Sequence, residues 1–164
     1  MTINGPLAFS NDPASFPADP KERHECLVDL FGQFLFWIRR CCLENAHKLT
    51  EDESARQRLG SIRSAYFEAV AHLPPEQRKA ALGFAEENLN LFIERLLWSL
   101  GDEGTDARIG SRHAYRFRIE MEIVDVESTQ VIDHETINRG GRFFGSYWGR
   151  WLNRFGKGDQ RGQA

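Results

Sequence analysis

The 164-residue chain has few cysteines and no long apolar run, and these two absences limit the kinds of protein that it can be. Its three cysteines, Cys26, Cys41 and Cys42, are odd in number and two are adjacent, which is not the pattern of a disulfide framework. The longest apolar run, residues 34–38, stops at Arg39, whereas a membrane-spanning helix needs roughly 18 apolar residues. The first residues also lack the basic start of a signal peptide. We therefore expect a cytoplasmic protein without a membrane span.

The sequence also lacks the motifs of common catalytic and cofactor-binding sites. No Cys-x-x-Cys or His-Glu-x-x-His occurs, and the glycines of residues 101–110 are not followed by the Lys-Ser or Lys-Thr of a phosphate-binding loop. We therefore predict no metal, no cofactor and no catalytic residue. A small enzyme would need histidines and a carboxylate to converge in a pocket, the candidates being His113, His134, Asp133 and Glu135. A solvated strand face with charge pairs explains these residues more simply.

What the chain does contain is charge and aromatic rings, unevenly placed. The net charge of −3 hides two regions of opposite sign: residues 1–135 hold 15 Lys or Arg and 23 Asp or Glu, whereas residues 136–164 hold six and one. Twelve Phe and four Trp supply apolar area for a folded core. The sequence thus combines an acidic body with a basic, aromatic end, and such segregation is typical of proteins that bind a charged partner.

Apolar residues recur every three or four positions in three long segments, which predicts helices. The predicted helices cover residues 20–48, 51–73 and 75–100. Asp19 followed by Pro20 is a typical helix start, because Asp caps free backbone N–H groups and Pro fits the first turn. Thr50 followed by Glu53 has the pattern of a capping box. Three helices joined by short links predict an antiparallel bundle.

The predicted bundle would bury an apolar stripe on each helix. On the second helix this stripe consists of Ala55, Leu59, Ile62, Tyr66, Ala69 and Leu73. On the third helix it consists of Ala85, Leu89, Phe92, Leu96 and Leu100. We expect both stripes to face the core, because a stripe of this spacing lies on one side of a helix.

After the helices, the period of the apolar residues changes from helical to alternating. Residues 101–112 are rich in glycine and polar side chains and predict a loop. From Tyr115 to Ile123 apolar and charged residues alternate strictly, which predicts a strand with one buried face. A turn at 127–129 and a second strand at 130–137 complete a predicted hairpin over residues 113–137.

The basic, aromatic end has an amphipathic pattern that predicts a helix over residues 141–155. At about 100° per residue, one arc holds apolar side chains and the opposite side holds arginines. The apolar arc consists of Phe144, Tyr147, Trp148, Trp151, Leu152 and Phe155. Glycines recur at Gly141, Gly145 and Gly149, which indicates close approach of another backbone or a helix that forms on docking.

Several interpretations of this C-terminal helix compete. In the first, which we favour, the aromatic arc packs on the chain's own domain. In the second, the arc and its arginines contact another protein, since Trp, Tyr and Arg dominate interface energies. In the third, the segment binds nucleic acid through stacked rings and basic residues, namely Arg139, Arg142, Arg150, Arg154 and Lys157. Binding to a membrane surface is a fourth.

Polar residues on the third helix offer another candidate binding site. Glu87 and Glu94 stand seven residues apart and so lie on one helix face, next to Asn88 and Arg95. A basic partner would fit such a seam. A solvated face is the simpler explanation.

Together these patterns predict an α+β fold: a three-helix antiparallel bundle, a β-hairpin and a C-terminal amphipathic helix, in one domain over residues 20–157. Residues 1–19 would form a flexible arm and residues 158–164 a disordered tail. For function we predict a non-enzymatic protein–protein interaction module, such as an inhibitor, an immunity-type protein or an adaptor, with a homo-oligomer left open. The predicted partner-binding residues are Arg142, Tyr147, Trp148, Arg150, Trp151, Arg154, Glu87 and Glu94.

Overall fold

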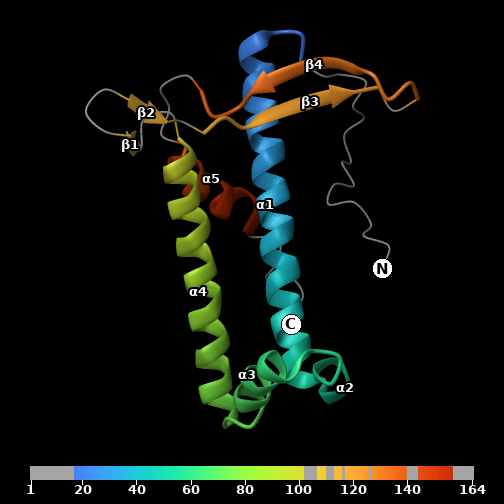
Figure 1. Cartoon of the computed structure of the whole chain (residues 1–164), viewed down its shortest axis with the longest axis vertical. Helices are drawn as coiled ribbons and strands as arrows, with labels where there is room; N and C mark the ends of the chain where they lie inside the picture. The colour runs from blue at the N-terminus through green and yellow to red at the C-terminus, as the bar shows by residue number, and fades with distance from the viewer. Residues whose placement is uncertain are drawn as a thin grey trace. The chain divides into compact units, whose positions relative to one another are not determined.

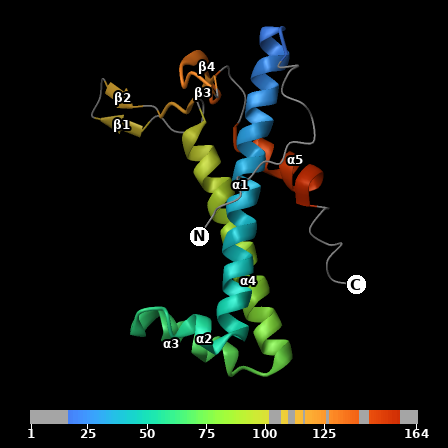
Figure 2. The same cartoon turned by 90° about the vertical axis from the view of Figure 1, so that its right-hand side faces the viewer.

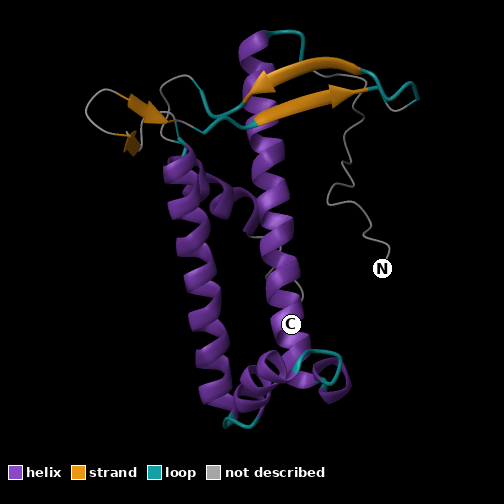
Figure 3. Cartoon of the chain, viewed as in Figure 1, coloured by secondary structure: helices purple, strands orange, loops and turns teal. Residues whose placement is uncertain are grey.

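The computed structural model describes residues 17–101, 107–109, 113–115, 117–125, 127–139 and 144–156. Its elements are, in order, α1 (Pro20–Glu51), α2 (Glu53–Arg56), α3 (Ser61–Ala71), α4 (Pro75–Leu100), β1 (Ala107–Ile109), β2 (His113–Tyr115), β3 (Glu120–Val124), β4 (Val131–Thr136) and α5 (Ser146–Phe155) (Figure 1). The chain is mostly helical with antiparallel hairpins, which confirms the predicted α+β class (Figure 3). Most of the predicted N-terminal arm and the whole predicted tail lie outside the described residues.

The chain divides into two compact units. The first unit consists of Met1–Phe36 and Ile93–Ala164, and the second consists of Trp37–Phe92. Helices α1 and α4 each contribute residues to both units. The predicted three-helix bundle and the predicted single domain over residues 20–157 stay predictions.

Helix α1 begins where the sequence predicts and for the predicted reason. The Asp19 carboxylate accepts hydrogen bonds from the backbone N–H groups of Lys21, at 3.0 Å, and Glu22, at 2.9 Å. Pro20 occupies the first helical position, where its missing N–H costs nothing. The helix then continues to Glu51, beyond the predicted end at residue 48.

The predicted capping box at Thr50 is wrong. Thr50 lies inside the last turn of α1, where its hydroxyl donates to the backbone carbonyl of Ala46 at 2.8 Å. Asp52 caps the next helix instead and accepts from the backbone N–H of Ala55 at 3.2 Å. Because aspartate is a stronger N-cap than threonine, the helix start moves to the residue with the better side chain.

The single helix predicted over residues 51–73 is also wrong, because the chain forms two helices there. Gly60 is extended, with φ −61° and ψ 152°, and precedes α3. Arg56, buried at the end of α2, donates to the backbone carbonyls of Leu49 and Thr50 at 3.0 and 2.9 Å. Carbonyls in the last turn of a helix have no partner within it, so the guanidinium holds α2 against the end of α1. This contact interrupts the helical pattern.

Helix α4 has the predicted bounds but buries a different face. Its buried residues are Ile93 and Leu97. Phe92 and Leu96, which belong to the predicted inner stripe, are exposed. Adjacent residues of a helix point about 100° apart. A predicted stripe that is shifted by one residue from the buried face therefore places its large side chains outside the core.

The hairpin β3–β4 forms with the predicted turn. Its register is Glu120–Thr136, Met121–Glu135, Glu122–His134, Ile123–Asp133 and Val124–Val131. At the turn, Asp125 accepts from the backbone N–H groups of Glu127 and Ser128, at 3.2 and 2.7 Å. Thr129 adopts a positive φ of 58°, which completes the reversal of the chain.

The strand predicted over residues 115–123 divides into two, and β2 pairs with β1 where a loop was predicted. The buried Asn138 side chain accounts for the gap between β2 and β3. It accepts from the backbone N–H of Ile119 at 2.9 Å and donates to the carbonyls of Phe117 and Leu100. The amide of Asn138 thus satisfies backbone groups that would otherwise pair with a neighbouring strand.

The core of the first unit forms where α5 lies beside α1 (Figure 2). Its rings pack directly, with centroids 5.8 Å apart for Phe31 and Phe144 and 5.0 Å apart for Phe36 and Trp148. The buried apolar residues of this unit are Leu27, Val28, Leu35, Phe36, Ile93, Leu97, Ile137, Phe144, Tyr147, Trp148 and Trp151. Gly32 lies so close to the indole of Trp151 that a Cβ there would overlap the ring.

Candidate functional site

Helix α5 binds α1 through polar contacts centred on Asp29, a residue of α1 that the sequence patterns did not single out. The Asp29 carboxylate accepts from the indole N–H of Trp151 at 3.1 Å and from the guanidinium of Arg150 at 2.8 Å. It also pairs with Arg154. One carboxylate therefore serves three donors of the same helix, and each bond involves an ionised group, which makes it stronger than a neutral one.

Glu25 lies one turn before Asp29 and extends the contact. It accepts from the Tyr147 hydroxyl and from Arg150, each at 3.3 Å. Burial alone would lower the pKa of Arg150, but the charges and hydrogen bonds of Asp29 and Glu25 raise it overall. The two carboxylates stand four residues apart on α1, and Arg150 and Arg154 stand four apart on α5. This matched spacing is the signal by which the sequence would have revealed the contact.

The predicted partner-binding residues of α5 have their contacts within the chain. Three of them are buried in the core of the first unit, namely Tyr147, Trp148 and Trp151. Arg150 and Arg154 are about half exposed although both are paired. Arg142 lies outside the described residues. A role for any of these residues in binding a partner stays a prediction.

Basic residues proposed for nucleic-acid binding are largely paired with the chain's own carboxylates. Arg139 donates to Glu135 at 3.1 Å, and both arginines of α5 pair with Asp29. A phosphate would have to compete with these carboxylates for the same guanidinium groups. The other two basic residues of that interpretation, Arg142 and Lys157, lie outside the described residues.

The histidine–carboxylate cluster that a small enzyme would need does not form among the described side chains. His134 is exposed on one face of β4, whereas Asp133 and Glu135 lie half-buried on the other, since successive side chains of a strand point to opposite faces. His113 belongs to β2, and its side chain is not among those described. Glu135 instead meets His24 of α1, whose Nδ1 lies 3.0 Å from the carboxylate.

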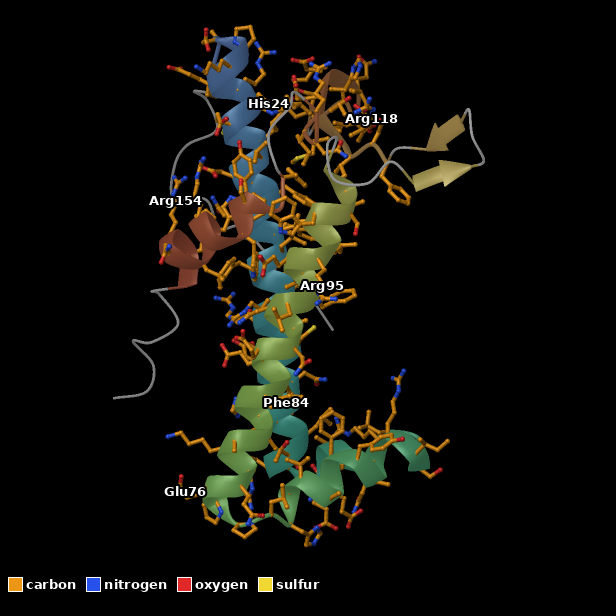
Figure 4. The ribbon with its side chains drawn as sticks, turned by 90° about the vertical axis from the view of Figure 1, so that its left-hand side faces the viewer. His24, Glu76, Phe84, Arg95, Arg118 and Arg154 are labelled. Atoms are coloured by element: carbon orange, nitrogen blue, oxygen red, sulfur yellow. The ribbon has the colours of Figure 1, made fainter. Side chains whose placement is uncertain are left out.

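Charged pairs join the half-buried face of the hairpin to the start of α1, where His24 lies (Figure 4). Arg23 pairs with Asp133, and His24 pairs with Glu135, which also accepts from Arg139. Burial alone would raise the pKa of Glu135, but the hydrogen bonds from His24 and Arg139 and the charge of Arg139 lower it overall. The predicted charge pairs are therefore present at these two carboxylates, although both carboxylates are half-buried instead of solvated.

The polar residues of α4 include partners of a buried arginine. In the second unit, Arg39 donates to the side-chain oxygen of Asn90 at 2.7 Å and pairs with Glu86. A buried guanidinium without such partners would be strongly destabilising. Glu87 is exposed in the second unit, and Glu94 is half-buried in the first. Partner binding through Glu87 and Glu94 stays a prediction.

The second unit exposes large apolar side chains instead of burying them. Every residue of α3 is described and none is buried, and Ile62 and Tyr66 are 74% and 71% exposed. On α4 of the same unit, Phe84 is 73% exposed (Figure 4). The apolar set of this unit consists of Ile62, Tyr66, Phe84, Leu91 and Phe92. The expectation that the stripes of these helices face a core is wrong at Ile62, Tyr66 and Phe92.

Part of this exposure is clustered, because Ile62 and Tyr66 lie one turn apart on α3, unlike the single apolar residues scattered over every protein surface. All residues of the second unit are described, and Leu49 is its only buried apolar side chain. The unit therefore exposes more large apolar side chains than it buries. Contiguous or clustered apolar exposure of this kind is typical of interaction sites.

Within the described part of the chain, no three His, Cys, Asp or Glu side chains gather closely enough to hold a metal ion. Burial, and then the charge of Asp29, raises the pKa of Cys26, which disfavours the reactive thiolate. Among the helices that the structure describes, none is both long and apolar enough to cross a membrane. The chain matches no protein-family model, no curated protein and no solved structure.

Proposed function

We propose that the chain is a non-enzymatic protein-interaction module and that a protein partner binds the apolar set of the second unit. The observation that carries this proposal is the exposure of α3, whose Ile62 and Tyr66 form an apolar ridge on successive turns although the helix buries none of its residues. Helices in proteins gain most of their stability from packing an apolar face. A partner that covers α3 would supply this packing.

The free energy available from covering the set is of the same order as the cost of association. An aromatic side chain buries about 150–250 Å², and burial contributes about 25 cal/mol per Å². Tyr66, Phe84 and Phe92 are each 63–73% exposed, so each ring would contribute about 2–4 kcal/mol on being covered. Three such rings are comparable with the estimated cost of association, about 4–15 kcal/mol.

Charge does not direct recognition at this surface. Residues 37–92 hold eight Lys or Arg and eight Asp or Glu, so the second unit has no net charge. The acidic excess expected to attract a basic partner belongs to the first unit. The apolar set would therefore select its partner by shape and apolar contact, while charges elsewhere on the chain would influence the rate of encounter.

The two other functions have less support. For nucleic-acid binding, Arg139, Arg150 and Arg154 are paired with carboxylates, and the rings of α5 that would stack on bases are buried. For a small enzyme, His134 lies on the opposite face of β4 from the neighbouring carboxylates. An inhibitor, an immunity-type protein or an adaptor would each fit an exposed apolar binding surface.

Retention of a partner by the full chain tests this proposal. The wild-type protein and a Tyr66→Ser/Phe84→Ser variant are immobilised and exposed to native extract at moderate and high salt. We expect a protein that the wild type retains at both salt concentrations and the variant loses. Both positions are exposed, so the variant should keep its fold, which circular dichroism would verify.

A matched control changes two exposed polar residues of the same unit, Gln57→Ser and Glu76→Ser, and should retain the partner. Equal retention by the wild type and the Tyr66→Ser/Phe84→Ser variant would overturn the proposal. Recovery of nucleic acid alone, released by high salt, would favour the basic C-terminal segment instead.

A further inference from the structure

The exposed face of α3 combines large and small side chains in a way that limits what can cover it. Ile62 and Tyr66 form a ridge one turn apart, and Ala65 and Ala69 form a shallow groove beside this ridge. All four residues are exposed. None is charged, and the charged residues of α3 lie away from this face. A helix with the same ridge and groove would fit it.

We propose that a second copy of this chain covers the face, with the two α3 helices antiparallel across a two-fold axis. This inference rests on the proposed function, because it names the partner of the same apolar set. In an antiparallel pair centred between Ala65 and Tyr66, Ile62 lies level with the second copy's Ala69. A two-fold axis repeats each contact in reverse, so Ala69 in turn lies level with Ile62 of the second copy. At both ends of the pair a large side chain meets a small one.

The centre of the pair also fits a self-interaction. The Ala65 residues of the two copies lie next to each other near the axis, where their small side chains let the backbones approach. The two Tyr66 rings lie at the opposite edge of the helix contact from the two Ala65 residues. They are close enough to each other to pack as an aromatic pair. Ridges at a spacing of four residues that interdigitate in this way form the commonest class of helix packing.

Charge favours a second copy over a charged partner. Identical copies present identical charges to each other, so a face used for self-association must avoid a net charge. The face of α3 is uncharged, and the second unit as a whole holds equal numbers of basic and acidic residues. A strongly acidic or basic partner would find no complementary charge on this face.

The exposed area of the α3 face would form the apolar centre of a dimer interface. A stable interface buries roughly 800 Å² on each partner. Tyr66 is 71% exposed and would supply roughly 100–180 Å² of this area, given about 150–250 Å² for a complete ring. Ile62 is 74% exposed and adds to that area, and a polar rim would supply the remainder.

Charges introduced at Ala65 test the two-fold axis. Ala65→Arg places two positive charges, and Ala65→Glu two negative charges, beside the axis of a dimer built from one variant. A 1:1 mixture places opposite charges there. We expect sedimentation velocity of the full chain to show a concentration-dependent wild-type dimer, about tenfold or greater weakening in either variant alone, and recovery in the mixture.

The position and the control make these results interpretable. Ala65 is exposed and both replacements favour helices, so each variant should keep the circular dichroism of the wild type. Asn45→Arg adds the same positive charge at an exposed position of α1 in the second unit and should leave the dimer unchanged.

Three results would overturn the inference: a wild-type chain that stays monomeric at every concentration, a dimer that both Ala65 variants leave intact, or a mixture that does not recover. The proposed function fails separately. A monomeric wild-type chain that still retains another protein through Tyr66 and Phe84 would leave that function standing. A chain with neither self-association nor such a partner would remove both.

Discussion

Among its described residues the first unit buries eleven apolar side chains and exposes seven large ones, whereas the second unit buries only Leu49 and exposes the five of the apolar set. Both units use parts of the same long helices, α1 and α4, so these helices do not explain the difference. The units differ in the additional helix: the rings of α5 pack on α1, whereas α3 has no fully buried residue. In this protein the larger core forms where an additional helix packs its rings on a long helix.

Truncating the buried Trp151 in the core of the first unit should produce the largest change in the free energy of unfolding. Trp151 is fully buried and bonded to Asp29, so we expect Trp151→Ala to lower the free energy of unfolding by about 3–5 kcal/mol. Phe84→Ala removes an exposed ring of the second unit and should change it by less than about 0.5 kcal/mol when the protein is dilute. Denaturant titrations followed by circular dichroism measure both changes. Equal losses would contradict the contrast between the units.

Replacing Gly32 and Gly83 with alanine should change the free energy of unfolding in opposite directions. A Cβ at Gly32 would overlap the Trp151 ring, so Gly32→Ala should lower the free energy of unfolding by about 1–3 kcal/mol. Gly83 lies in α4 with open space around the position of a Cβ. Because alanine favours helices, Gly83→Ala should raise this free energy by about 1 kcal/mol. Thermal unfolding of both variants checks the signs, and a stabilising Gly32→Ala would show that Trp151 does not pack as described.

The smallest expected effect concerns the carboxylate that holds the hairpin on α1. Glu135→Gln should lower the free energy of unfolding by about 0.5–1 kcal/mol near pH 7 by weakening the contacts with His24 and Arg139. The folded state lowers the pKa of Glu135 from 4.5, so its contribution is complete above that value and is lost as the pH falls through the lower, folded pKa. The difference between the wild type and Glu135→Gln should therefore vanish in acid.

Denaturant titrations at a series of pH values measure this difference. Glu87→Gln, at an exposed position of the second unit, is the matched control and should show no comparable dependence on pH. A difference between Glu135→Gln and the wild type that grows on acidification would contradict the pairing.

Local signals in the sequence predicted local structure well. The Asp19 cap, the bounds of α4 and the turn before β4 all depend on residues close together in the chain, and all three are present. Where a prediction was wrong nearby, a side chain bonds to the backbone: Arg56 binds the end of α1, and the amide of Asn138 replaces a strand neighbour of residues 117–119. The spacing of apolar residues in the sequence carries no information about such contacts.

The direction in which a helix faces was harder to predict than the helix itself. The spacing of Ile62 and Tyr66 identifies a ridge, but an apolar ridge fits a core and an interface equally well, so spacing alone cannot say which one it joins. The contacts of Asp29 and Glu25 with α5 cross more than 120 residues of chain. Their only trace in the sequence is two pairs of opposite charge with the same spacing of four.

The hydrogen bonds of Asn138 make the fold sensitive to a slow chemical change at this one residue. Slow hydrolysis of the asparagine amide would remove the donor that binds the carbonyls of Leu100 and Phe117 and would turn a negative oxygen towards them. One chemical change would then disconnect the end of α4 from the segment that leads into β3. In protein that has been stored for a long time, the hairpin should detach from the end of α4 before the helices unfold.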